Sequence, residues 1–485
     1  MRIKQFFLDG LGHQSYLISD EAAGVAAVVD PRRDIEVYLK EAERQRAQIT
    51  HVFETHVHND YVTGALELRD RVGATIVTAA AAGVGYEHLG VREGDSVAVG
   101  GLRFVALETP GHTPGHLSYA LYAPEASEPH AVFTGGSLLT SAIGRTDLVS
   151  PGMTLTLTRD QYRSLRRLLD TLPVATLVYP THGAGSFCGA TSLTSDARSS
   201  TIGQERVNNP VSQAADEAEF VRQQMAGYGL YPSYYHHMRD INIAGPRVFG
   251  AVPEIKGLSA TQVRDLLSAG VPLLDGRSRD AFAREHVPGA FNLELDGSFG
   301  SYVGWLLPFN APLTLLIEDV SGLREAAAQL FRIGFEQAQG YLDGGMDAWK
   351  AEGYPTATFE RISVAVLRRR LGAQEQEALA VLDVRDETEW RDGHIPGAQH
   401  LHIADLPRHL HETPLDRPIA VVCHSGYRAS IGASIIAALG RQTIAVEGGV
   451  RDWIASGYPT LYGPGDGAAG AAHAHDGHAH EHAHP

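Results

Sequence analysis

The second half of the chain contains two copies of one sequence pattern, and this repeat constrains the fold more than any other feature. Leu-Asp-x-Arg followed by His-x-Pro-Gly-Ala occurs at residues 274–290 and again at residues 382–398. Gly-Gly, a tryptophan and Gly-Tyr-Pro follow at residues 344–355 and at residues 448–459. The copies are too long and too few for a solenoid, so we expect two similar α/β domains in tandem.

The chain has 485 residues, which is too long for one hydrophobic core. Residues 1 to about 200 alternate short β runs with helical stretches, as in an α/β fold. A helix predicted at residues 214–225 belongs to an arm that packs on this first domain. The predicted domains are a first domain with its arm at residues 1–245, the two repeats at residues 255–357 and 360–462, and a disordered tail at residues 463–485.

Charge and cysteine content exclude several functional classes. The formal net charge of -17 argues against nucleic-acid and anionic membrane partners. Two cysteines, Cys188 and Cys423, cannot form a secreted disulfide framework. No signal peptide is evident, and the longest apolar run, residues 22–29, is too short to span a bilayer. We expect a cytoplasmic protein with neither a nucleic-acid nor a membrane partner.

Histidines recur at the ends of predicted strands in the first domain. His56 and His58, with Asp60 two residues further on, follow one apolar strand, and His112 and His182 follow later strands. A lone histidine at such a position is more often structural. Three separate loops that each deliver histidine favour a metal site, and imidazole and carboxylate ligands suit zinc or non-haem iron.

The N-terminal region resembles the metallo-β-lactamase superfamily through Thr55-His56-Val57-His58-Asn59-Asp60 and the Thr-Pro-Gly-His-Thr-Pro-Gly-His run at residues 109–116. Together with Gly144-Arg145-Thr146-Asp147, these motifs are similar to the glyoxalase II and persulfide dioxygenase branch. The resemblance implies a metallo-β-lactamase-like αββα sandwich with a metal-dependent activity. It also makes Arg145 a candidate substrate-binding residue.

Two departures from the family pattern restrict the metal site. Tyr61 stands where the family has the last histidine of HxHxDH, and Gly136 stands where the family has a metal-binding aspartate. Glyoxalase II needs both missing groups for two metals, so the resemblance implies one ion, Fe(II) or Zn(II). The ligand set that remains is His56, His58 and His112, with open positions for water or substrate. A metal-free scaffold is the alternative.

Several residues near the predicted ligands have more than one interpretation. Asp60 and His182 are candidates for supporting the ligand histidines or for a second metal position. Tyr61 is a candidate for filling the space of the missing ligand. Cys188 is close to His182 in the sequence, which makes it a candidate redox thiol, although a buried structural cysteine is the simpler interpretation.

The second repeat contains the loop Cys423-His424-Ser425-Gly426-Tyr427-Arg428 between an apolar strand and a helix-forming stretch. Inward backbone N–H groups and a helix N-terminus lower the pKa of a thiol and make it a nucleophile. Residues 360–460 resemble the rhodanese sulfurtransferases in this loop and in the repeat motifs. The resemblance implies that Cys423 carries a persulfide, that residues 424–427 bind substrate and that Arg428 holds an anionic sulfur compound. Phosphatases with an arginine loop have one more residue between cysteine and arginine, so phosphatase activity is the weaker interpretation.

The first repeat contains no cysteine. Aligning residues 321–324 with residues 425–428 places Asp319 opposite Cys423, and a carboxylate cannot accept a sulfane sulfur. We therefore predict an inactive rhodanese-like domain with a structural or docking role.

The order of domains resembles persulfide dioxygenase–sulfurtransferase fusions of bacterial sulfide detoxification. This resemblance implies that the first domain oxidises a low-molecular-weight persulfide to sulfite and that Cys423 transfers sulfane sulfur. The alternatives are a mononuclear zinc thioester hydrolase resembling glyoxalase II and a metal-free persulfide-binding module that serves the rhodanese. The expected partners are a small persulfide or thiosulfate, a low-molecular-weight thiol and a second copy of the chain, which the arm would hold in a dimer.

The tail is rich in glycine, alanine and histidine. Its polar composition predicts either transient Zn²⁺ or Ni²⁺ binding, a metal reservoir for the first domain, or a solubilising role. The histidines are His473, His475, His478, His480, His482 and His484.

Overall fold

The structure, a computed structural model, describes residues 1–183, 185–189, 197–372, 379–409, 411 and 417–464. The predicted tail lies outside the described residues from position 465 onward. The chain divides into two compact units. The first contains residues 1–282 and 292–356, and the second contains residues 283–291 and the chain from residue 357. Among the helices of the described residues, none has the length and apolar character needed to cross a bilayer.

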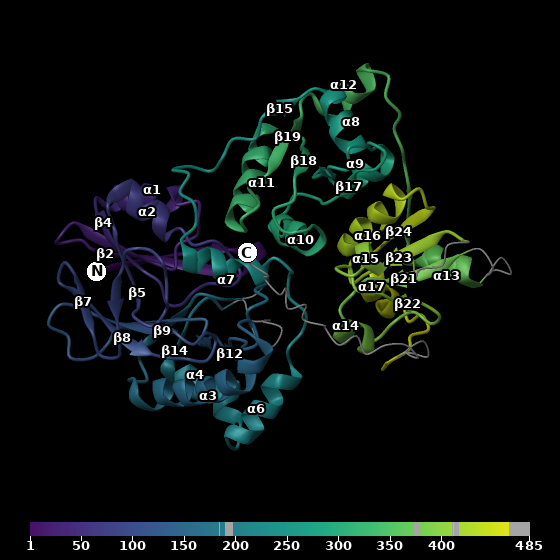
Figure 1. Cartoon of the computed structure of the whole chain (residues 1–485). Helices are drawn as coiled ribbons and strands as arrows, with labels where there is room; N and C mark the ends of the chain where they lie inside the picture. Colours follow the sequence, from purple (N-terminus) through teal and green to yellow (C-terminus); the bar gives the residue numbers. More distant parts are fainter. Residues whose placement is uncertain (184, 190–196, 373–378, 410, 412–416, 465–485) are drawn as a thin grey trace, which may run out of the picture. The chain divides into compact units, whose positions relative to one another are not determined.

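Two six-stranded mixed sheets form the N-terminal part of the first unit (Figure 1). In the first sheet, β1 to β3 pair antiparallel and β3 to β6 pair parallel. In the second sheet, β10 and β13 pair parallel and the other neighbours pair antiparallel. The strands in spatial order are β1 (Arg2–Leu8), β2 (His13–Asp20), β3 (Val25–Val29), β4 (Gln48–Phe53), β5 (Thr75–Ala79) and β6 (Leu89–Val91), then β14 (Ser200–Thr201), β13 (Leu177–Pro180), β10 (Ala131–Gly135), β9 (Leu117–Tyr122), β8 (Leu102–Glu108) and β7 (Ser96–Val99).

Buried apolar side chains hold the two sheets face to face. Inward side chains of both sheets, such as Phe53 and Phe133, form one cluster between them. Because side chains alternate along a strand, the other apolar side chains point outward. They are covered by α1 (Glu36–Gln45) and α2 (Ala65–Val72) on the first sheet and by α3 (Thr154–Thr171) on the second. The predicted αββα sandwich is confirmed.

The arm that follows the sandwich is helical. Its helices are α4 (Ile202–Asn208), α5 (Pro210–Gln213), α6 (Glu217–Ala226) and α7 (Tyr235–Ala244). The helix predicted at residues 214–225 begins at Glu217, because the Asp216 carboxylate accepts a hydrogen bond from the Glu219 N–H and caps the helix there.

The two repeats have the same architecture, as their sequences predict. The strand order is β15-β19-β18-β16-β17 in the first repeat and β20-β24-β23-β21-β22 in the second. The central pairs of both sheets are parallel. The first contains β15 (Gly257–Leu258), α8 (Ala260–Ser268), β16 (Leu273–Asp275), α9 (Arg279–Arg284), β17 (Phe291–Asn292), α10 (Phe299–Leu306), β18 (Leu313–Leu316), α11 (Val320–Arg332), β19 (Ala338–Leu342) and α12 (Gly345–Ala351). The second contains β20 (Glu360–Ser363), α13 (Val364–Gly372), β21 (Ala380–Asp383), α14 (Glu387–Arg391), β22 (Gln399–His400), α15 (Leu406–His409), β23 (Ile419–Val422), α16 (Tyr427–Ala438), β24 (Thr443–Glu447) and α17 (Gly449–Ala455).

Within the first unit, the first repeat contacts the loop that carries the predicted metal ligands. Arg332, the last residue of α11, forms a bidentate ion pair with Asp34, with N···O distances of 2.8 and 2.7 Å. The backbone carbonyl of Arg332 accepts a hydrogen bond from the Val62 N–H at 2.8 Å. Arg33 donates to the Phe331 carbonyl at 3.1 Å. The end of α11 therefore supports the segment that follows Asp60.

Candidate active sites

Loops at the carboxyl ends of several strands of the sandwich converge at one buried point. His56, His58 and Asp60 follow β4, His112 follows β8, and His182 follows β13. Each of these side chains is at most 1% exposed. The ring centroid of His56 lies 4.9 Å from that of His112 and 5.5 Å from that of His182. Loops that are far apart in the sequence thus place their imidazoles together.

Three groups of potential ligands have their donor atoms within 4.8 Å of one another. They are His56 with His112 and His182, His56 with His58 and Asp30, and His58 with Asp60 and His182. The set predicted from the sequence, His56 with His58 and His112, is not among these groups of the described residues.

Hydrogen bonds fix the tautomers of two of the rings. The Thr55 hydroxyl donates to Asp30 Oδ2 at 2.7 Å, so it can only accept from His56 Nδ1, 2.8 Å away. The His112 Nδ1–H donates to the Arg145 carbonyl at 2.6 Å. In both rings Nε2 therefore carries the free lone pair that a metal needs.

The same rings are held in the neutral form. Burial, together with the neighbouring His182, lowers the pKa of His112 to about 3. Burial and the adjacent imidazoles also hold the pKa of His56 well below its usual value. A metal ligand must be a deprotonated imidazole nitrogen, so these two residues fit a metal.

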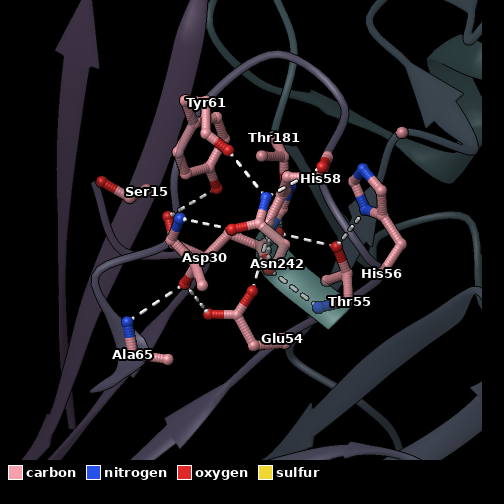
Figure 2. Close-up of polar contacts among 12 residues, drawn as sticks. Ser15, Asp30, Glu54, Thr55, His56, His58, Tyr61, Ala65, Thr181 and Asn242 are labelled. Carbon is pink, nitrogen blue, oxygen red and sulfur yellow. Dashed lines mark hydrogen bonds and ion pairs between the residues drawn. The ribbon is translucent and has the colours of Figure 1, made fainter. Parts of the chain in front are cut away.

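His58 occupies a different environment. Its Nε2 lies 2.9 Å from Glu54 Oε2 and 3.4 Å from Asp30 Oδ1 (Figure 2). Burial alone would lower the pKa of His58, but the two carboxylates outweigh it and raise the pKa to about 10. Asn242 of α7 donates to the His58 carbonyl at 2.9 Å and holds its backbone. His58 is thus placed as the cation of a buried carboxylate pair.

Asp60 lies beside His182, with 3.3 Å between Asp60 Oδ2 and His182 Nδ1. Burial by itself would raise the pKa of Asp60, but His182 and the other nearby histidines lower it to about 2. The Tyr61 hydroxyl donates to the Asp30 carbonyl at 3.3 Å, and its ring packs against His13. The tyrosine therefore fills space next to the cluster, and the carboxylate faces His182.

Several residues that organise this site carry no strong sequence pattern. Asp30 accepts from the Thr55 N–H at 2.7 Å and from the hydroxyls of Thr55 and Thr181, as Figure 2 shows. Its place directly after the apolar strand β3 was a usable sign. Glu54 follows the apolar strand β4 in the same way. Asn242 gave no such sign, because its contacts join residues 184 and 181 positions apart.

Arg145 is a buried structural cation. It forms a bidentate pair with Asp147, with both N···O distances 2.7 Å. It also donates to the Phe187 carbonyl at 3.2 Å and to the Gly229 carbonyl at 2.7 Å. Only 3% of the residue is exposed, so its described partners are protein groups of the arm and of the loop after β13.

Cys188 is also buried, and its backbone carbonyl accepts from the Arg145 N–H at 2.8 Å. Burial raises the pKa of the Cys188 thiol well above its usual value. A protonated, enclosed thiol is a poor nucleophile, so the environment favours the structural interpretation of this cysteine.

In the second unit, Cys423 follows β23 and lies at the N-terminus of α16. The Gly426 N–H donates to Cys423 Sγ with an N···S distance of 3.1 Å. The loop carbonyls point the other way: that of Cys423 accepts from the Val450 N–H at 2.7 Å, and that of His424 from the Arg451 N–H at 3.2 Å. The first turn of α17 thereby orients the loop around the sulfur.

The Gly-Gly motif at residues 448–449 makes room for the close contact between the first turn of α17 and the Cys423 loop. Gly449 has a φ of +57°, and a Cβ there would overlap the Cys423 carbonyl oxygen and lie 2.6 Å from that of His424. At the equivalent Gly345 of the first repeat, φ is +58° and a Cβ would meet nothing within 4 Å. The motif is shared, but only the second repeat uses it to hold a cysteine loop.

The remaining residues of the cysteine loop differ in exposure and partners. Arg428 forms a bidentate pair with Glu389, at 2.6 and 2.8 Å, and lies 3.3 Å from Asp386. The side chains of His424 and Ser425 are exposed, whereas Gly426 is buried and Tyr427 is half-buried. His424 and Ser425 can therefore meet a substrate from solvent, while Arg428 is engaged with α14.

The predicted alignment of Asp319 with Cys423 is wrong. The matching aspartates Asp275 and Asp383 pair with Leu316 and Val422 in their sheets. The residue after Leu316 is Ile317, so Ile317 occupies the position of Cys423. Asp319 instead caps α11, with its carboxylate accepting from the Gly322 N–H. An isoleucine has no atom that can accept a sulfur, which supports an inactive first repeat.

Comparisons with known proteins match each part of the chain. Residues 8–182 match the model of the metallo-beta-lactamase superfamily, and residues 259–352 and 363–456 match the rhodanese-like domain. A metallo-beta-lactamase from Staphylococcus aureus is similar in structure, with a TM-score of 0.63, 27% identity and coverage of 70% of this chain and 98% of that one.

Two kinds of curated relative match the N-terminal half. A hydroxyacylglutathione hydrolase of Rhodospirillum rubrum is 35% identical over 34% of this chain and 60% of its own length. The mitochondrial persulfide dioxygenase ETHE1 of the mouse is 31% identical over 43% of this chain and 74% of its own length. The chain thus spans 60% of the length of the hydrolase, and the two relatives are similarly distant.

Proposed function

Because the chain belongs to the metallo-β-lactamase superfamily and carries two rhodanese-like domains, we propose that it is a sulfur enzyme with two centres. The metal centre oxidises a low-molecular-weight persulfide to sulfite, and the second rhodanese-like domain transfers sulfane sulfur through Cys423. The observation that carries this proposal is the Cys423 loop, in which a backbone N–H is directed at the sulfur beside a helix N-terminus.

In the transfer half, the Cys423 thiolate attacks the outer sulfur of thiosulfate or of a persulfide. The S–S bond of the donor breaks, a new S–S bond forms to Cys423, and sulfite or a thiolate leaves with the electron pair. Thiosulfate and the thiolate thus give the Cys423 persulfide anion and sulfite. The Gly426 N–H and the positive end of α16 stabilise the negative sulfur before and after transfer.

In the oxidation half, a persulfide, O₂ and water give a thiol, hydrogen sulfite and a proton. The outer sulfur loses four electrons, and O₂ accepts them. His56 and His112 would hold the metal, and bound Fe(II) would supply the redox chemistry that O₂ requires. Thr55 and the Arg145 carbonyl fix the orientation of the two rings. The sulfite formed is itself an acceptor for the Cys423 persulfide, which would link the halves chemically.

A zinc-dependent thioester hydrolase is the second candidate for the N-terminal centre. The similarity to hydroxyacylglutathione hydrolases, at 35% identity, favours it as strongly as the similarity to the persulfide dioxygenase favours the first. One bound zinc ion would polarise a thioester carbonyl and activate water.

The two candidates differ in metal and in substrate. We expect a chain ending at Tyr462, which lacks the histidine tail, to bind stoichiometric iron and to consume O₂ only when a persulfide is present. His56→Ala and His112→Ala should each abolish O₂ uptake and metal binding, and Cys423→Ser should abolish only sulfur transfer. Zinc with thioester cleavage would establish the hydrolase instead. Unchanged metal content and O₂ uptake in both histidine variants would refute the metal centre proposed here.

A further inference from the structure

The resemblance to the metallo-β-lactamase superfamily implies a metal-binding aspartate at position 136, where this chain has a glycine. We propose that the metal is held by three histidines, His56, His112 and His182, and that His182 replaces the missing carboxylate as the third ligand. This assignment concerns the ligands only, so it holds for a dioxygenase and for a hydrolase.

The space around Gly136 shows why a carboxylate is missing. A Cβ built on Gly136 would lie 2.6 Å from His112 Nε2 and still closer to the Cδ2 of the same ring. The imidazole of His112 packs directly on the glycine, so any side chain there would push the ring away. The absence of a side chain at position 136 therefore leaves the room that the imidazole of His112 occupies.

The three rings present unpartnered nitrogens to one another. Their donor atoms all lie within 4.8 Å, a spacing that one ion can bridge. His56 Nε2, His112 Nε2 and both nitrogens of His182 are buried without a hydrogen-bond partner. A buried polar atom without a partner destabilises the folded protein. Three such rings at one point are best explained by a group that they bind together.

Each ring has a support on the side away from the common point. His56 is held by Thr55 and through it by Asp30, and His112 is held by the Arg145 carbonyl. His182 Nδ1 makes no hydrogen bond, but Asp60 Oδ2 lies 3.3 Å from it, close enough to support the ring. Ligand histidines in metal proteins characteristically have such a partner for the second nitrogen, which orients the ring.

His58 is the competing third ligand, and its surroundings argue against it. Its Nε2 lies 2.9 Å from Glu54 and 3.4 Å from Asp30, which leaves Nδ1 as its available ligand atom. Among the described residues, His58 forms no group with His56 and His112 whose donor atoms all lie within 4.8 Å of one another, whereas His182 does. His182 has no such competing partner, since Asp60 can support it while it binds.

The choice between His182 and His58 can be made by spectroscopy on the full-length protein loaded with Co(II). In His182→Cys the third ligand becomes a thiolate, so we expect a thiolate-to-cobalt charge-transfer band that the wild-type protein lacks. His58→Cys should add no such band. A band in His58→Cys and none in His182→Cys would overturn the proposal. Cys188, Cys423 and the histidine tail are present in every sample, so their contribution cancels.

Metal affinity gives a second readout that does not depend on activity. His182→Ala should weaken Zn(II) binding, measured by chelator competition, by more than about 100-fold, the upper end of what removal of a supporting residue costs. His58→Gln should weaken it by about 10-fold or less. Far-UV circular dichroism in chelator shows whether each variant is folded. Equal losses in the two variants, or a larger loss for His58→Gln, would contradict the assignment.

The Gly136 arrangement has its own test. Gly136→Asp restores the superfamily residue but should lower Zn(II) affinity, because its Cβ displaces His112. Gly136→Ala, which adds a Cβ without a carboxylate, should lower it as much. A rise in affinity for Gly136→Asp alone would show that the aspartate is an accessible third ligand and would overturn the three-histidine site.

Discussion

At the scale of single residues, one shared glycine has different surroundings in the two repeats. Gly345 and Gly449 occupy equivalent positions with φ of +58° and +57°. Both residues adopt a left-handed backbone conformation, but only Gly449 lies so close to the carbonyl oxygens of Cys423 and His424 that a Cβ would overlap them. The same residue type therefore has a conformational role in one copy and an additional packing role in the other.

A matched pair of substitutions separates these roles. Gly345→Ala should destabilise the protein by about 1–2 kcal/mol, the usual cost of a left-handed alanine, and leave sulfur transfer unchanged. Gly449→Ala should have the same conformational cost and also push the Cys423 carbonyl off the Val450 N–H. We expect thiosulfate-to-cyanide sulfur transfer to fall at least about tenfold, or about 1.4 kcal/mol in the barrier. Equal activity of the two variants would contradict this role.

At the scale of elements, α7 forms hydrogen bonds to the backbone of the loop that carries His56, His58 and Asp60. Asn242 is 2% exposed and donates to the carbonyls of His58 and Tyr61 at 2.9 and 2.8 Å. The side-chain oxygen of Asn242, Oδ1, accepts a hydrogen bond from the Thr63 N–H at 3.0 Å. Next to α7, the Tyr234 hydroxyl donates to the Asp60 carbonyl at 2.8 Å. The arm is thus part of the site and not a separate appendage.

Asn242→Ala should therefore destabilise the first unit more than an ordinary surface change does. The substitution leaves buried backbone groups of the loop unpaired, at about 1–3 kcal/mol for each group that water cannot reach. We expect a loss of about 2–4 kcal/mol by chemical denaturation, together with weaker Zn(II) binding. Asn208→Ala, at an exposed position of α4, is the control and should change stability by no more than about 0.5 kcal/mol. A similarly small change for Asn242→Ala would show that the arm does not support the loop.

Most elements of the sandwich could be predicted, because apolar alternation and helical spacing are local properties. The start of α6 differed by a few residues, since the Asp216 cap decides it. The contacts of Asn242 could not be predicted. They join segments about 180 positions apart, and no local pattern reports which distant backbone groups an amide will meet.

At the scale of the whole molecule, the first repeat has the same fold as the second but no cysteine at the position of Cys423. Ile317 occupies the nucleophile position, and the end of α11 supports the sandwich instead. Arg332 and Asp34 are 6% and 8% exposed, so water contributes little to their solvation. The repeat is therefore expected to act as a support for the metal loop within the first unit.

Removing one partner of that ion pair tests the support. Arg332→Ala leaves Asp34 buried without its main cation, which typically destabilises a protein by about 3–5 kcal/mol. Hydrogen exchange should increase in residues 56–63 and stay unchanged in residues 419–438 of the second unit. Arg324→Ala, at an exposed position of the same helix, is the control. Unaltered exchange in residues 56–63 would show that the first repeat does not stabilise the metal loop.

The sequence alone determined the architecture of this protein. Periodicity, the repeated motifs and the histidine loops predicted an αββα sandwich and two parallel α/β domains, because burial patterns and turn residues act over a few positions. It also identified Cys423 as a thiol between a strand and a helix, since that loop is contiguous in the chain.

Only the tertiary structure decided how the histidines are used. His58 is only two residues from His56 in sequence, but its Nε2 faces Glu54 and Asp30. His182 is far away in sequence and lies beside His56 and His112. Ligand choice depends on which charges and lone pairs meet in a buried space, and those meetings are set by packing between distant segments. The register of the sheets likewise shows that Ile317, and not Asp319, occupies the position in the first repeat that Cys423 occupies in the second.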